Sequence, residues 1–353
     1  MHHSSQYALT YPIIVFKKIL NLRSFLFIKN QNTILMKKIL SLLLISVLGL
    51  CISCKHPTPE PDPIPEPEPT PVFEAGTLPG VFSIGPNKQV KFSSGNLQYQ
   101  ATTSTWRFAE KQYDIIGAAN ANASANYGGW IDLFGWATSG WNCGNTYYMP
   151  YEQGWVDNYS IGMGYGPLPV GTTSLTGEYA NCDWGVYNAI SNGGNQAGMW
   201  RTMSQEEWEY LINGRANAAS KRGIACIEGQ NGLVVLPDNW VLPEGCTFNA
   251  GMSAGDGMQY YSAKNYYSAE QWVKMEENGA LFLPAAGGRN NLENGDITYI
   301  GEVGRYWTVT PCNTQYFTEC AYAFYFDSSM NSTDEIDSPR DYGRSVRLVK
   351  DVR

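Results

Sequence analysis

The chain has 353 residues, of which 43% are hydrophobic and 16% charged, and its net charge is −8. Residues 1–54 hold six of the 24 Lys and Arg and none of the 32 Asp and Glu, so the remainder carries 18 basic and 32 acidic residues, a net charge of −14. This charge excludes nucleic acid and anionic lipid headgroups as expected partners, because both bind proteins chiefly through basic side chains.

The histidines exclude a further set of functions. All three, His2, His3 and His56, precede residue 75, where the folded domain is expected to begin. Without a histidine, that domain cannot build a Ser-His-Asp triad, a Cys-His pair or an imidazole-based zinc or iron site. Carboxylate or cysteine chemistry remains open, although the commonest general base is missing.

The first element in chain order is an export signal at residues 36–54. Met36 is followed by Lys37 and Lys38 and then by an uncharged apolar run, ILSLLLISVLGL. The run of about 12–15 apolar residues is shorter than the roughly 20 that cross a bilayer, and its flanks are those of a secretory signal. Residues 1–35 are basic and apolar and precede this second start, so we interpret them as an upstream extension that is not translated.

The signal ends in Ile52-Ser53-Cys54, which resembles the lipobox of bacterial lipoproteins, whose cysteine is acylated and becomes the first mature residue. Cys51 is the alternative acceptor, but bulky Leu50 precedes it, where such sites prefer a small residue. An uncleaved membrane anchor with two unmodified cysteines is another alternative. We expect lipidation at Cys54, membrane attachment through that lipid, and location in the outer membrane, on the periplasmic face or the cell surface.

Residues 55–74 are expected to form a tether. Proline stands at nearly every second position from 57 to 69, which removes backbone donors and prevents helix or sheet. The interspersed Glu and Asp repel one another and extend the segment further. A Pro-rich recognition peptide is the alternative, but the segment lacks basic flanks.

Residues 75–353 are expected to form one domain, long enough at about 280 residues for a well-buried core. Its first strands are predicted at 80–84 and 88–92, which alternate apolar and polar residues around a Gly-Pro-Asn turn, and the pattern continues at 96–100 and 105–108. Residues 120–198 are dense in Gly, Asn, Tyr and Trp with little periodicity, which predicts long structured loops.

Two helices are signalled by capping boxes. In the first, the Ser204 hydroxyl can accept the Glu207 amide proton while Glu207 reaches back, and the helix is expected to end near residues 213–214. The second opens at Ser268 with Gln271 in the corresponding position and is expected to end at 278–279. Further strands are predicted at 232–236, 280–284, 306–309, 321–326 and 345–349. Two main helices, several short strands and long loops indicate an α+β fold.

Six cysteines lie in the expected domain, and none forms a CxxC motif. In an oxidising compartment they permit up to three disulfides, and buried free thiols are the alternative. Cys312 and Cys320 form the best candidate pair for a disulfide, because they are close in sequence and on one expected loop.

Several motifs resemble a known family. WRTMS at 200–204 and EWEYL at 207–211 resemble the helix motif of the formylglycine-generating-enzyme family, and YGRSVRLV at 342–349 resembles its closing strand. In the same order, segments of the chain resemble a group of Bacteroidetes lipoproteins with lectin-like domains: LFLPAAGGR, GRYWTVTP, AYAFYF and YGRSVRLV. The resemblance spans about residues 76–350 and implies a C-type-lectin-like fold.

The resemblance implies a fold and leaves the reaction open. The enzyme branch uses a closely spaced cysteine pair near its C-terminus, but the spacing and flanks of Cys312 and Cys320 differ from it. The fold also hosts ligand-binding proteins whose variable residues lie in C-terminal loops and strands. We therefore expect a non-enzymatic domain that binds a glycan or a protein. The alternatives are a cysteine-dependent enzyme of the formylglycine-generating class and a structural subunit of a surface assembly.

Ligand contacts are expected between the motifs that resemble the family, where polar and aromatic residues gather. The candidates are Tyr316, Phe317, Asn331, Asp334, Arg340 and Tyr342. Trp208, Trp240, Trp272, Trp307 and Arg347 are expected to be scaffold. No cofactor is expected, although the acidic cluster Asp334, Glu335 and Asp337 could hold calcium; it lacks the regular spacing of a known calcium loop.

Overall fold

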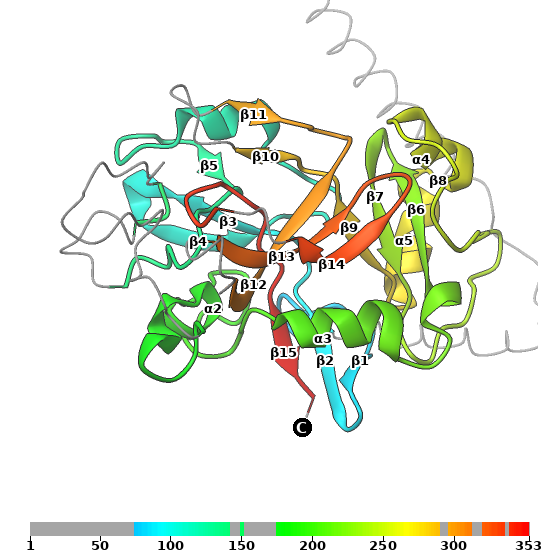
Figure 1. The fold of residues 1–353 in the computed structure, drawn as a ribbon, viewed down its shortest axis with the longest axis horizontal. Coiled ribbons are helices and arrows are strands. Elements are labelled where there is room, and N and C mark those ends of the chain that lie inside the picture. The colour runs from blue at the N-terminus through cyan, green and yellow to red at the C-terminus, as the bar shows by residue number, and fades with distance from the viewer. Residues whose placement is uncertain are drawn as a thin grey trace, which may run out of the picture. The chain divides into compact units, whose positions relative to one another are not determined.

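The computed structural model describes residues 74–141, 149–151, 174–289, 296–312, 320–335 and 339–352, without the side chains of 334 and 335 (Figure 1). All of them belong to the second of two units into which the chain divides, Thr70–Arg353. The predicted signal peptide, Cys54 and most of the tether lie outside the described residues. No helix within the described ranges has the length and apolar character needed to cross a bilayer.

One three-stranded sheet joins the beginning of the domain to its end. Strand β1 (Phe82–Gly85) pairs with β2 (Lys88–Phe92), which pairs on its other side with β15 (Val349–Asp351), all antiparallel. The hairpin predicted at 80–92 is therefore confirmed. Figure 1 shows these three strands together below the helix α3.

The other described strands form four more small sheets, in the orders β4-β3-β5, β8-β6-β7-β9, β10-β11 and β12-β13-β14. Neighbouring strands are antiparallel except for β6 and β8. Their bounds are β3 (Leu97–Gln100), β4 (Thr105–Phe108), β5 (Trp130–Ile131), β6 (Arg222–Ile227), β7 (Gln230–Val235), β8 (Tyr266–Tyr267), β9 (Leu281–Pro284), β10 (Gly288–Arg289), β11 (Ile297–Thr298), β12 (Gly304–Cys312), β13 (Cys320–Phe326) and β14 (Asn331–Glu335).

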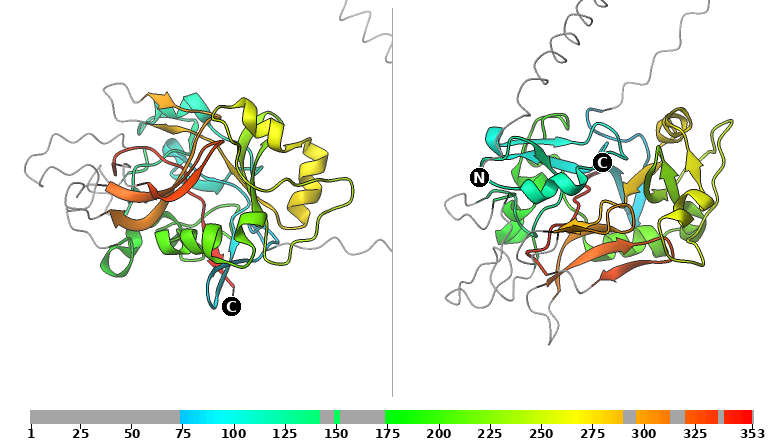
Figure 2. Two further views of the ribbon diagram at one scale, coloured as in Figure 1. Left: turned by 45° about the vertical axis from the view of Figure 1, so that its right-hand side comes forward. Right: turned by 90° about the horizontal axis from the view of Figure 1, so that it is seen from above.

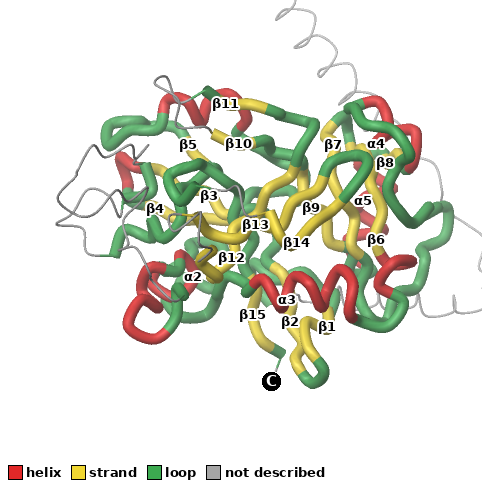
Figure 3. Tube along the Cα trace, in the orientation of Figure 1, coloured by secondary structure: helices red, strands yellow, loops and turns green. Residues whose placement is uncertain are grey.

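The two helices predicted from capping boxes are confirmed as α3 (Gln205–Glu209) and α5 (Ala269–Glu277), and both boxes are formed. Helix α3 continues as a π-helical turn, Tyr210–Gly214, and so ends where the sequence predicts. The remaining described helices are short: α2 (Trp184–Tyr187), α4 (Gln259–Lys264) and the 3₁₀ segments Ala101–Thr103, Gly117–Asn122, Gly177–Cys182 and Ala218–Lys221. Small sheets with few helices make this an α+β structure, as predicted (Figure 3).

Aromatic side chains dominate the interior. Trp208 is 1% exposed and stacks on Phe324 of β13, with ring centroids 4.7 Å apart, which fixes α3 against the sheet β12-β13-β14. The expected scaffold residues Trp272, Trp307 and Arg347 are also buried, whereas Trp240 is half-buried at the edge of a core cluster. The core therefore depends on aromatic packing between segments far apart in the sequence.

The closing strand differs from its prediction at 345–349. Regular pairing begins only at Val349, because the preceding residues cross between sheets and make single bridges to separate segments. These bridges are Gly343 to Arg289, Arg344 to Phe134 and Ser345 to Tyr306. Residues 343–345 change partner at each position. The sequence therefore has the pattern of a strand, although these residues do not form a continuous ladder of hydrogen bonds with one neighbour.

Candidate functional site

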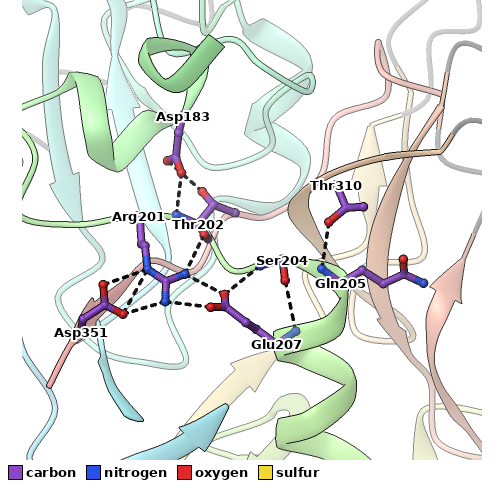
Figure 4. A network of polar contacts seen from close by, with 8 residues as sticks. All are labelled: Asp183, Arg201, Thr202, Ser204, Gln205, Glu207, Thr310 and Asp351. Atoms are coloured by element: carbon purple, nitrogen blue, oxygen red, sulfur yellow. Dashed lines mark hydrogen bonds and ion pairs between the residues drawn. The ribbon is translucent and has the colours of Figure 1, made fainter. Parts of the chain in front are cut away.

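The N-terminus of α3 is fixed by a network of polar side chains (Figure 4). The Glu207 amide donates to Ser204 Oγ at 3.2 Å, and the Ser204 amide donates to Glu207 Oε2 at 3.0 Å. Arg201 donates to Glu207 Oε2 at 2.7 Å and to Asp351 Oδ1 at 2.7 Å, so one guanidinium joins α3 to β15. These charge-assisted contacts hold the first turn of the helix in one position.

Two further side chains, Asp183 and Thr310, extend this network to other parts of the domain. The buried Asp183 carboxylate accepts the Thr202 amide at 2.8 Å and caps α2 by accepting the Gly185 amide at 3.0 Å. Burial raises the pKa of Asp183 to about 6. The Gln205 amide donates to Thr310 Oγ1 of β12 at 3.1 Å. Helix α3 is thus anchored at its start to three separate segments.

The C-terminal end of the same helix is also held by arginines. Arg215 Nε donates to the Leu211 carbonyl at 2.8 Å, and Arg222 donates to the Ile212 carbonyl. Such contacts satisfy carbonyls that a helix end leaves without intrahelical partners. Single π-helical turns such as Tyr210–Gly214 are rare and are frequently found at functional sites.

A pocket of about 320 Å³ lies along this helix. It is lined by Gln205, Glu206, Glu209, Tyr210 and Gly214. Strand β14 runs beside the helix in both Figure 1 and Figure 2, and its Thr333 hydroxyl donates to the Glu209 carboxylate. The site therefore lies where a firmly anchored helix meets a C-terminal strand.

The lining residues suit binding by hydrogen bonds. Glu206 and Glu209 are exposed carboxylates that accept hydrogen bonds, while Gln205 and Tyr210, both half-buried, can donate and accept. Glu206, Glu209 and Tyr210 share one face of the helix because they are spaced i, i+3 and i+4. The exposed surface of the pocket is mostly apolar, and the two carboxylates can accept hydrogen bonds from hydroxyl or N–H groups.

The structure places the predicted ligand residues in different settings. Asn331 is half-buried on β14, two positions before Thr333, and the backbone of Asp334 follows in the same strand. Tyr342 is half-buried, with the Arg344 guanidinium carbon 5.0 Å from its ring centroid. Tyr316 and Phe317 lie outside the described residues. The structure thus brings Asn331 and Asp334 to the strand beside the pocket.

The expectation for Arg340 as a ligand contact is corrected. Its side chain is 1% exposed, and its guanidinium carbon lies 4.6 Å from the ring centroid of Trp136. Its Nε also donates to the Cys320 carbonyl at 3.1 Å. Arg340 therefore belongs to the packed interior, because its long apolar stem and planar head cover an indole that lies about 200 residues away in the chain.

Cys312 and Cys320 are free thiols in the structure, so the predicted disulfide is not formed there. They stand directly opposite each other on β12 and β13, and the Cys320 thiol donates to the Cys312 carbonyl at 3.5 Å. Burial and the neighbouring Cys312 thiol raise the pKa of Cys320. Cysteine nucleophiles are activated by the opposite shift.

Other sequence expectations fall on buried or undescribed positions. Cys182, Cys226 and Cys246 are buried free thiols, and burial raises the pKa of Cys182 to about 12. Within the described part of the chain, no three His, Cys, Asp or Glu side chains gather as metal ligands would. The side chains of the acidic cluster that could hold calcium, Asp334, Glu335 and Asp337, lie outside that part.

The pocket residues Glu206, Glu209 and Tyr210 were not expected to contact a ligand. They lie beside or within the capping box and the motif that resembles the family, so from the sequence we interpret them as residues that form the helix. Their i, i+3 and i+4 spacing places them on one face of the helix, and this pattern could have indicated a shared binding surface. In comparisons with protein-family models, curated proteins and solved structures, nothing matches this chain.

Proposed function

We propose that this chain is a lipid-anchored, extracytoplasmic binding protein whose domain has a C-type-lectin-like architecture and binds a glycan or protein ligand where α3 meets β14. The observation that carries the proposal is the pocket of about 320 Å³ beside the strand that bears Asn331. Its volume is at the lower end of the range of about 300–1,000 Å³ for small-ligand sites. A single sugar residue or one side chain of a protein fits that scale.

The lectin-like architecture is supported by how the family-like motifs meet. Arg201, from the first motif, exchanges backbone hydrogen bonds with Val349 of the last, at 3.0 and 2.9 Å. The segments 304–311 and 321–326 pair with each other within β12 and β13. Motifs that are scattered along the sequence therefore form one connected part of the structure.

Binding is favoured over cysteine-dependent catalysis by the state of the thiols. Burial raises the pKa of Cys320, and Cys312 opposite it is 0% exposed, so burial keeps both sulfur atoms from a peptide substrate. The pocket residues, in contrast, are exposed or half-buried and carry hydrogen-bonding groups. The side chains that line this pocket therefore support binding over cysteine chemistry.

The test is a glycan array and a pull-down with the purified chain, followed by titration of the ligand found. Glu206→Gln and Glu209→Gln should each weaken binding at least tenfold, because each removes a charged acceptor from the pocket. Glu270→Gln is the matched control, since Glu270 holds the same helix position in α5 as Glu206 in α3. Undiminished affinity in both pocket variants would place the site elsewhere.

A further inference from the structure

Tyr299, which follows β11, is held in a conformation that bulky residues avoid. Its φ is +60°, and its side chain is 53% exposed. The amides of Glu302 and Val303 both donate to its carbonyl, at 3.0 and 3.1 Å. A Cβ on Gly287 would come within 2.2 Å of the Thr298 carbonyl, so the backbone before Tyr299 is closely packed as well. The strain at Tyr299 is therefore imposed by its surroundings and is not offset by burying the ring.

The ring of Tyr299 lies beside a cation. The guanidinium carbon of Arg305 is 5.7 Å from the Tyr299 ring centroid and 5.2 Å from that of Tyr325. Arg305 and Tyr325 face each other directly across β12 and β13. A half-buried guanidinium is thus flanked by two aromatic rings, one from β13 and one from the turn after β11, within the range of a cation–π contact.

Tyr325 is itself positioned by a turn at the end of β13. Its hydroxyl donates to Asp327 Oδ2 at 2.7 Å. The other oxygen of Asp327 accepts the amides of Ser329 and Met330 at 2.7 and 2.8 Å. Burial alone would raise the pKa of Asp327, but these hydrogen bonds hold it below its usual value, so the carboxylate that orients Tyr325 stays charged. The rings and the cation are therefore arranged in advance of any ligand.

We propose that Tyr299, Arg305 and Tyr325 form a binding platform for a sugar that carries a carboxylate. A guanidinium can donate two parallel hydrogen bonds to a carboxylate, and tyrosine rings offer flat apolar surfaces with a polar edge to a sugar ring. The net charge of −14 repels large anionic partners. Salt screens charges that lie more than about 8 Å away, so a small anionic ligand in contact with Arg305 is attracted mainly by that cation. None of the three residues lines the α3 pocket, so this proposal stands independently of it.

The test is titration calorimetry of the purified full chain with oligosaccharides of galacturonic, glucuronic and sialic acids, each beside its neutral methyl ester. At least one acid should bind, and its ester at least tenfold more weakly. Arg305→Gln should weaken the binding of that acid at least tenfold, and Arg305→Lys should also weaken it because lysine keeps the charge but loses the planar fork. Arg107→Gln is the matched control, since Arg107 lies 3.9 Å over the Trp130 ring at another place.

Tyr299→Gly separates binding from folding. Glycine adopts positive φ without strain, so this variant should keep or raise the melting temperature while it loses affinity at least tenfold. The proposal is overturned if none of the acids binds, if acid and ester bind equally, or if Arg305→Gln and Tyr299→Gly bind as the parent does. Loss of acid binding in Glu206→Gln alone would likewise overturn it and assign the ligand to the α3 pocket.

Discussion

The Arg347 guanidinium donates a hydrogen bond of 2.8 Å to Oε1 of Gln112, 235 residues earlier in the chain. Arg347 also donates to Asn96 Oδ1 at 3.3 Å. The same Gln112 oxygen accepts the amide of Phe282 in β9, so one buried amide connects the closing segment to the sheet β8-β6-β7-β9. A buried guanidinium thus donates to neutral side chains, and the Glu276 carboxylate interacts with it electrostatically.

Arg347→Met should destabilise the domain by about 1–3 kcal/mol. Burial lowers the pKa of Arg347 to about 10, a penalty that methionine would relieve. Two hydrogen bonds from a charged donor are lost, however, at about 1.5–3 kcal/mol each, together about 3–6 kcal/mol against a relief of about 3 kcal/mol. The Glu276 carboxylate also loses the positive charge near it. Urea unfolding of the variant, of Gln112→Leu and of the double mutant measures the coupling between the two residues. Additive losses would show that the contact contributes nothing of its own.

The buried carboxyl of Asp132 should make stability depend on pH. It accepts the Ile116 amide at 2.9 Å and the Asn120 side-chain amide at 2.8 Å, and burial raises its pKa to about 6. A raised pKa means that the protonated form is favoured in the folded state. The contribution of this group to stability is fully present below about pH 3.8 and is lost as the pH rises through about 6.

Asp132→Asn removes this titration and so isolates it. The unfolding free energy of the parent minus that of the variant should be about 2 kcal/mol larger at pH 4 than at pH 7, because most of a shift of about two pKa units acts between these pH values. Subtracting the variant cancels every other titrating group. A difference that does not change between the two pH values would show that Asp132 titrates normally.

Trp208→Ala should cost about 3–5 kcal/mol of unfolding free energy, because it leaves a cavity beside Phe324 at the junction of α3 and β13. Trp240→Ala, which removes an equal volume from a half-buried position, is the control and should cost less. Chemical denaturation of both variants provides the comparison. Equal losses of unfolding free energy in the two variants would show that the burial of Trp208 does not add to its contribution to stability.

Mild oxidation should link Cys312 to Cys320. Residues directly opposite each other in antiparallel strands have Cα atoms about 4.5–5.5 Å apart, within the range that a disulfide spans. Treatment with diamide and peptide mapping should find this bond in the parent and in Cys182→Ser, but not in Cys312→Ser. If both thiols remain alkylatable after oxidation and denaturation, the side chains do not approach each other as the backbone register indicates.

Cys54→Ala should block acylation and leave an unprocessed precursor, because attachment of the lipid precedes signal cleavage in this pathway. Cells labelled with a fatty-acid analogue should show label on the parent and none on the variant. Cys51→Ala is the control for the neighbouring cysteine and should be labelled as the parent is. The reverse pattern would assign the lipid to Cys51.

Local signals made the helices predictable. The Ser204 and Ser268 boxes fix a helix start within four residues, so no knowledge of the rest of the chain was needed. The hairpin of β1 and β2 was predictable for the same reason. Strand β6 was missed, since its sequence, RGIACI, lacks alternation because five of its six residues are buried.

Long-range packing made the site residues hard to predict. The sequence around Arg340 is typical of an exposed loop. The side chain is buried by its contact with Trp136, and no residue near position 340 indicates that contact. Strand β14 lies beside the helix that lines the pocket, and the contact of Thr333 with Glu209 joins them across 124 positions. A helix face can be identified from spacing, but whether a strand lies beside it depends on the tertiary fold.

The pairing of β2 with β15 has a consequence for the order of folding. Phe92 is the partner of Val349, so this sheet cannot close until all the residues between them have been synthesised. Contacts of such long sequence separation slow folding, because the entropy of closing the loop is lost before the contact forms. A chain that emerges gradually from the ribosome would keep its two ends apart until late, and this delay would suit the export in an unfolded state that the proposed signal peptide implies.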